Sequence, residues 1–160
     1  MNNFVAKPVF QQGRQAVVLL VEDNADHAFL AQEAFEGLSQ NVNLQHVDNG
    51  EKCMAFLRRQ APYETAPRPD LILLDIHMPR MNGFEVMEAI ARDETLLGIA
   101  VVVLTTSSTP LEVRRMYQLG CHSYMVKPVN FGVFLAAIEK LASYWFDLVI
   151  LPGCATKSGA

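Results

Sequence analysis

The amino-acid sequence predicts an α/β protein, built as a doubly wound, five-stranded parallel sheet with helices on both faces. Strand-like runs alternate along the chain with segments of helical periodicity, which is the pattern of consecutive β-α units in a parallel sheet. Three of the runs are continuously apolar, as expected of strands buried on both faces. These runs are AVVLLV (16–21), LILL (71–74) and IAVVVL (99–104).

The first two β-α units are predicted before residue 58. The run AVVLLVED (16–23) is a buried strand that ends in two acids, and Asn24 behind it is a candidate helix N-cap. NLQHV (43–47) is a shorter and more polar strand, after which Asn49 opens a second helix. The apolar stripes that predict the two helices consist of Ala28, Ala31, Phe35 and Leu38 in the first, and Met54 and Leu57 in the second.

The third unit begins after a segment that holds three prolines, RRQAPYETAPRP (58–69), which predicts a surface loop. DLILLD (70–75) is the next buried strand and ends in a carboxylate. The spacing predicts a helix over 83–92, with an inward stripe formed by Phe84, Met87 and Ile90.

The last two units follow the same pattern. IAVVVLTT (99–106) is a buried strand, Pro110 suits the first turn of a helix that ends at Gly120, and SYMV (123–126) is a short strand. Asn130 then caps the final helix. Its apolar stripe consists of Phe131, Phe134, Leu135, Ile138, Leu141, Ala142 and Trp145.

Length and composition indicate one globular domain. Of 160 residues, 51% are hydrophobic and 19% are charged, and the net charge of -4 does not favour nucleic-acid binding. No run predicts a membrane span or a secretory leader, and the three cysteines lack metal spacing, so we expect a cytoplasmic protein. The expected boundaries are a flexible N-terminal extension over 1–15, the domain over 16–146, and a C-terminal extension and tail over 147–160.

Polar side chains stand where the predicted strands end. Glu22 and Asp23 follow the first strand, Asp75 the third, Thr105 the fourth and Lys127 the fifth. The carboxyl ends of parallel strands meet at one edge of a sheet, where ligands bind. Three clustered carboxylates repel one another unless a cation compensates, and oxygen ligands favour Mg²⁺. With an ammonium and a hydroxyl beside them, they predict a phosphoryl site in which Asp75 is the nucleophile.

Four motifs occur in a recognisable order: VEDN, LLDIHMPRMNG, VVLTTS and YMVKP. Together they resemble the receiver domain of two-component response regulators over 17–144, and the spacings from Asp75 to the later motifs also match. The resemblance implies a flavodoxin-like fold with strand order 2-1-3-4-5. The long loop before the third strand, the TTS sequence and the tail YWFDLVILP are similar to single-domain regulators that pair with cyanobacterial phytochrome-type histidine kinases.

The resemblance also implies a metal site. Asp75 matches the phosphoacceptor of the family. Asp23 matches the direct Mg²⁺ ligand, with Glu22 assisting. The backbone carbonyl of His77 matches the third protein ligand.

Three further positions match the residues that handle the phosphoryl group. Lys127 matches the lysine that contacts phosphoryl oxygens, and its bond to Pro128 is then expected to be cis. Thr105 matches the hydroxyl that binds the phosphoryl group, and Tyr124 the aromatic that turns inward when that hydroxyl moves. The family usually has a small residue where this chain has Thr106, and we expect its bulk to slow hydrolysis of the phosphoryl group.

The expected function is a phosphorylation-dependent switch without an output domain: a phosphoacceptor that supports its own phosphorylation and dephosphorylation, and not an enzyme. A histidine kinase, of the phytochrome type by resemblance, is the expected partner. A phosphate sink for a kinase and a flavodoxin-like FMN electron carrier are the alternatives, although the acids after the first strand oppose FMN. A phosphohydrolase is ranked last, because His77 stands where it needs a second carboxylate.

Several residues receive no functional role. We expect His27, His46 and His122 to be surface or packing residues and the cysteines to behave as small apolar side chains. The tail after residue 144 is too apolar to be free, so it either folds back on its own domain or joins a homodimer through the last helices. Its apolar residues are Trp145, Phe146, Leu148, Val149, Ile150 and Leu151.

Overall fold

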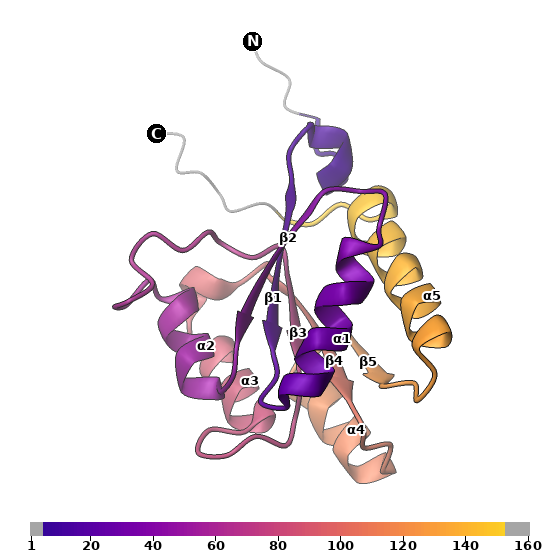
Figure 1. The fold of residues 1–160 in the computed structure, drawn as a ribbon. Helices are drawn as coiled ribbons and strands as arrows, with labels where there is room; N and C mark the ends of the chain where they lie inside the picture. The colour runs from indigo at the N-terminus through magenta and orange to yellow at the C-terminus, as the bar shows by residue number, and fades with distance from the viewer. Residues whose placement is uncertain (1–4, 153–160) are drawn as a thin grey trace.

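The computed structural model describes residues 5–152 and has a five-stranded parallel sheet between two layers of helices (Figure 1). The strand order is β2-β1-β3-β4-β5, so the predicted fold class and strand order are confirmed. The strands are β1 (Ala16–Val21), β2 (Val42–Val47), β3 (Leu71–Leu74), β4 (Ala100–Thr105) and β5 (Ser123–Val126).

The five α-helices divide between the two faces of the sheet. Helices α1 and α5 pack together on one face, and α2, α3 and α4 lie on the other (Figure 1). No helix within residues 5–152 has the length and hydropathy needed to cross a membrane. The helices are α1 (Ala25–Glu36), α2 (Gly50–Leu57), α3 (Gly83–Ala91), α4 (Pro110–Gln118) and α5 (Phe131–Ala142).

Asparagine caps start most of these helices. The side chains of Asn24, Asn49 and Asn130 each accept a hydrogen bond from the backbone N–H three residues later, which confirms the predicted caps. Asn82 does the same at α3, where Glu85 completes a capping box. Helix α4 begins at its proline, as predicted.

The sheet separates two apolar clusters, which explains the uninterrupted apolar strands. Successive side chains of a strand point to opposite faces, and here each face is covered by helices. In β3, Ile72 and Leu74 face α2 and α3, whereas Leu71 and Leu73 face α1 and α5. All four side chains are fully buried.

Two details near α5 differ from the predictions. The Lys127–Pro128 bond is trans and not cis, and the cis bond among the described residues is Ala61–Pro62. The trans isomer is intrinsically favoured by about 0.5–1 kcal/mol. Phe131, predicted in the core stripe, is 43% exposed because it is the first residue of α5 and lies at the carboxyl edge of the sheet. One turn later, Phe134 is buried.

The segment before β1 contains a short helix and tertiary contacts, although its sequence predicts no regular structure. Residues 9–12 form a 3₁₀ helix in which Val9 is buried, and the ring of Phe10 lies 5.3 Å from that of Phe146, edge to face. Arg14 forms a bidentate ion pair with Asp70, with nitrogen–oxygen distances of 2.9 and 2.6 Å. The predicted extension therefore contacts the domain from Val9 onward, while the mobility of this segment and the domain boundaries remain predictions.

The apolar tail partly folds back. Residues 143–148 continue α5 as a π-helix, and Phe146 is fully buried in the cluster beneath α1 and α5. The chain then crosses Gly98, where an added Cβ would lie 3.0 Å from the carbonyl oxygen of Pro152. By contrast, Leu148 is 69% exposed and Ile150 is 54% exposed. Cys154 and the sequence ATKSGA lie outside the described residues.

Candidate functional site

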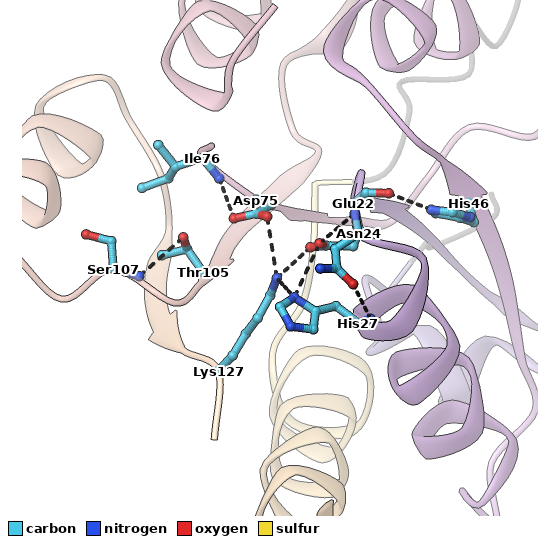
Figure 2. Close-up of polar contacts among 9 residues, drawn as sticks. All are labelled: Glu22, Asn24, His27, His46, Asp75, Ile76, Thr105, Ser107 and Lys127. Carbon is cyan, nitrogen blue, oxygen red and sulfur yellow. Dashed lines mark hydrogen bonds and ion pairs between the residues drawn. The ribbon is translucent and has the colours of Figure 1, made fainter. Parts of the chain in front are cut away.

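Strand register gathers four of the predicted residues at the carboxyl edge of the sheet: Glu22, Asp75, Thr105 and Lys127 (Figure 2). The ends of β1 and β3 are paired, so the residues that follow, Glu22 and Asp75, lie side by side. The ends of β4 and β5 are also paired, and the backbone N–H of Lys127 donates to the carbonyl of Thr105 at 2.8 Å. The four residues therefore stand on neighbouring strands, as the sequence predicted.

Three acids form a compact cluster at this edge. One carboxylate oxygen from each of Glu22, Asp23 and Asp75 lies within 4.8 Å of the other two. Glu22 is 2% exposed and Asp75 is 8% exposed, whereas Asp23 faces solvent. A set of hard oxygen donors with one open side fits a divalent cation that keeps water ligands.

Lys127 partly compensates the charge of this cluster. Its Nζ donates to Oε2 of Glu22 at 2.6 Å, Nδ1 of His27 at 3.0 Å and Oδ2 of Asp75 at 3.4 Å (Figure 2). The lysine side chain is only 11% exposed, which strengthens its interaction with the carboxylates. One ammonium leaves the three acids with excess negative charge, as a cation site requires.

Glu22 is the least solvated of the acids. Burial raises the pKa of Glu22 to about 7, and repulsion from Asp75 adds to the shift, while the bond from Lys127 opposes it. The backbone N–H of Asn24 donates to the other carboxylate oxygen of Glu22 at 3.2 Å. The protonation of this site therefore changes near neutral pH.

The backbone around Asp75 explains the glycine of the MNG sequence. Oδ1 of Asp75 accepts from the N–H of Ile76 at 2.8 Å, and the carbonyl of Ile76 accepts from the N–H of Gly83 at 2.8 Å. An added Cβ at Gly83 would lie 2.5 Å from the carbonyl oxygen of Asp75 and 2.8 Å from Cα of Ile76. Only glycine allows α3 to begin this close to the backbone of Asp75 and Ile76.

The two predicted switch residues contact the loop that follows β4. Thr105 is fully buried, and its Oγ1 lies 3.5 Å from the N–H of Ser107. The hydroxyl of Tyr124 donates to the carbonyl of Ser107 at 2.9 Å, and its ring packs on the cluster beneath α2 and α3. Both residues are therefore linked to one loop, and their movement on phosphorylation remains a prediction.

The histidines only partly follow the predictions. His77 is an exposed loop residue, as expected, with Nε2 3.1 Å from a carboxylate oxygen of Glu112, and metal binding through its carbonyl remains a prediction. His27 is more than a surface or packing residue, since it contacts Lys127. Its position four residues after Asp23, on the first turn of a predicted helix, was the available sequence signal.

The remaining polar candidates have structural roles. Nε2 of His46 lies 2.8 Å from the carbonyl oxygen of Glu22, and Nδ1 of His122 accepts a hydrogen bond from the backbone N–H of Val101 in β4 at 2.9 Å. Burial raises the pKa of Cys53 to about 12 and that of Cys121 to about 11, so both behave as apolar side chains at neutral pH, as expected.

Residues 18–139 match the family model described as the response regulator receiver domain. Among curated relatives, the response regulator Rcp1 of Synechocystis sp. is 38% identical over 136 residues, which cover 85% of this chain and 92% of Rcp1. The probable methanogenesis regulatory protein FilR2 of Methanothrix harundinacea is 36% identical over 140 residues, which cover 87% of this chain and 89% of FilR2.

Solved structures match equally well. The phosphorylated cyanobacterial phytochrome response regulator RcpA superimposes with a TM-score of 0.83 at 34% identity, covering 88% of this chain and 100% of RcpA. The Mn²⁺-bound form of Rcp1 superimposes with a TM-score of 0.79 at 37% identity, covering 86% of this chain and 99% of that structure.

Proposed function

This chain belongs to the response regulator receiver domain family, and from this premise we propose that it accepts a phosphoryl group from a histidine kinase on Asp75 and signals through altered protein contacts. One observation carries the proposal. Asp75 lies at the carboxyl edge of the sheet within a cluster of acids, with the Lys127 ammonium 3.4 Å from its Oδ2. A carboxylate used only as a turn residue needs neither neighbour.

The side chains support an in-line transfer. A carboxylate oxygen of Asp75 attacks the phosphorus of a phosphohistidine, the phosphorus–nitrogen bond breaks, and its electron pair remains on the imidazole. Lys127 is placed to stabilise the charge on the phosphoryl oxygens, and the Thr105 hydroxyl can donate to one of them. Mg²⁺, held by Asp23 and Asp75 with help from Glu22 and the His77 carbonyl, would supply further charge compensation.

We infer that the donor is a phytochrome-type kinase, because RcpA is described as a phytochrome response regulator. The test is phosphotransfer from a panel of purified histidine kinases that includes phytochrome-type and unrelated members, with Asp75→Asn as the control. Preferential transfer from the phytochrome-type kinases is expected. Equal or faster transfer from an unrelated kinase would contradict the assignment. A kinase that loses its phosphoryl group to the regulator while no binding partner responds would favour the phosphate sink.

Mg²⁺ affinity is expected to depend on pH through Glu22. Because the pKa of Glu22 is raised to about 7, lowering the pH protonates a group that must be charged to favour the cation. The affinity should fall about tenfold between about pH 8 and about pH 6. Metal titration at several pH values measures this, and Glu22→Gln should remove most of the slope. A parent protein whose affinity is constant over the range would refute the prediction.

Hydrolysis of the phosphoryl group is expected to accelerate in Thr106→Ala. Thr106 is exposed and lines the cavity beside Lys127, where its bulk can hinder an attacking water. Removing it should lower the barrier by about 1–2 kcal/mol, a five- to thirtyfold faster loss. The decay of the phosphorylated species, followed by intact mass, gives the rate. Equal decay in the parent and the variant would remove the steric explanation.

We also propose a homodimer that uses the end of the chain. Leu148 and Ile150 remain largely exposed after Phe146 has been buried, so they are available to a second copy. Light scattering across a dilution series should detect a dimer that Leu148→Gln weakens. Phe29→Gln, which changes another largely exposed apolar residue, on α1, is the control and should have no effect. A parent protein that is monomeric with and without a phosphoryl mimic would exclude the dimer.

A further inference from the structure

The Lys127 ammonium has three hydrogen-bond acceptors, of which two are also placed to bind a divalent cation. An ammonium has three N–H groups, and the described residues supply one acceptor for each: Glu22, Asp75 and His27. The two carboxylates belong to the acidic cluster that fits a divalent cation. His27 is the one partner of the ammonium outside that cluster.

The backbone of His27 is held in place by the start of α1. Its N–H donates to the Asn24 side chain at 3.1 Å, which is the helix cap, so the ring projects from a fixed first turn. Nδ1 lies 3.0 Å from Nζ of Lys127, whereas Oε1 of Glu22, at 3.6 Å from Nδ1, is beyond hydrogen-bond distance. Because an ammonium can only donate, Nδ1 must be the acceptor, and we assign the ring proton to Nε2 on this basis.

Among residues 5–152, no side chain other than Glu22, Asp75 and His27 is hydrogen-bonded to the Lys127 ammonium. A cavity of about 240 Å³ adjoins the side chains of Lys127 and His27, between α1 and the start of α5. Apart from these two side chains and those of Glu22 and Thr106, its wall is apolar and includes Leu104 and Phe134. Without the imidazole, the ammonium would face this apolar wall once the carboxylates turn toward a cation.

We propose that His27 is a positioning residue: its Nδ1 holds the Lys127 ammonium at the phosphoryl site when the carboxylates are engaged with metal. This inference rests on the proposed phosphorylation of Asp75. It assigns His27 no contact with the phosphoryl group or the cation. It therefore predicts an effect on the rate of phosphorylation and none on metal affinity.

The test compares His27→Leu with His27→Asn. The two replacements are similar in size, but only asparagine keeps an acceptor at the position of Nδ1. At saturating Mg²⁺, phosphorylation by acetyl phosphate should be about tenfold slower in His27→Leu and within about twofold of the parent in His27→Asn, as loss of a charged hydrogen bond implies. Mg²⁺ affinity should stay within about twofold of the parent in both.

Three results would overturn the inference: equal rates in His27→Leu and the parent, equal slowing in both variants, or a matching loss of Mg²⁺ affinity. The ¹⁵N shifts of the imidazole in the unaltered protein give a measurement that needs no variant. An unprotonated Nδ1 is expected, and a protonated Nδ1 would contradict the assignment. A parent that acquires no phosphoryl group would instead refute the proposed function.

Discussion

Lys127→Met is expected to slow phosphorylation of Asp75 by about 10²–10³-fold, the usual cost of removing one preorganised donor from a site that develops charge. Lys127 is nearly buried, and its Nζ contacts both Glu22 and Asp75. Methionine keeps most of the length of the side chain but has no donor. The initial rate of phosphoryl uptake from acetyl phosphate, at saturating Mg²⁺, measures the effect.

Lys140→Met is the matched control, because Lys140 is an exposed lysine in the last turn of α5. It should be phosphorylated at the parent rate. If Lys127→Met were also phosphorylated at that rate, the ammonium would have no part in the transfer. If both variants were slowed alike, the effect would come from net charge and not from the site.

Phe146→Ala is expected to lower the free energy of unfolding by about 3–5 kcal/mol, as large-to-small changes in a packed core do. Phe146 is fully buried beneath α1 and α5 and lies against Phe10 from the other end of the chain. Its removal opens a cavity and weakens the contact between the two terminal segments. Denaturant unfolding, monitored by circular dichroism, gives the free energy.

Leu148→Ala provides the comparison within the same π-helix. Leu148 is largely exposed, so its replacement should change the free energy of unfolding by no more than about 0.5 kcal/mol. A loss in Phe146→Ala as small as the one expected for Leu148→Ala would mean that Phe146 does not belong to the core. The two variants also separate the roles of the tail, because only Leu148 is expected to affect the homodimer.

The strands and the acidic site could be predicted from sequence because their signals are local. Apolar runs such as LILL (71–74) require burial on both faces, and parallel pairing then brings whatever follows them to one edge. Asp75 and Lys127 were predicted together for this reason, although 52 residues separate them. The helix caps at Asn24 and Asn49 could also be predicted from local sequence, because each asparagine directly precedes an amphipathic segment.

The features that were missed depend on contacts between distant segments. Nothing near Val9 indicates that it is buried, because its segment contacts the π-helix of residues 143–148 at the other end of the chain. The contact of His27 with Lys127 spans 100 residues and depends on where α1 starts relative to β5. The isomer at Lys127–Pro128 was transferred from a family resemblance, and no local signal in the sequence could have corrected it.

Intact-mass analysis of the parent and Asp75→Asn, each incubated with acetyl phosphate and Mg²⁺, tests the central claim most directly. The parent should gain the mass of one phosphoryl group, lose it again on hydrolysis of the acyl phosphate, and gain nothing when the metal is chelated. Asp75→Asn should gain nothing under any of these conditions. A parent that stays unmodified with both acetyl phosphate and a phosphorylated kinase, or an Asp75→Asn variant that acquires the same labile group, would contradict the assignment of Asp75 as the phosphoacceptor.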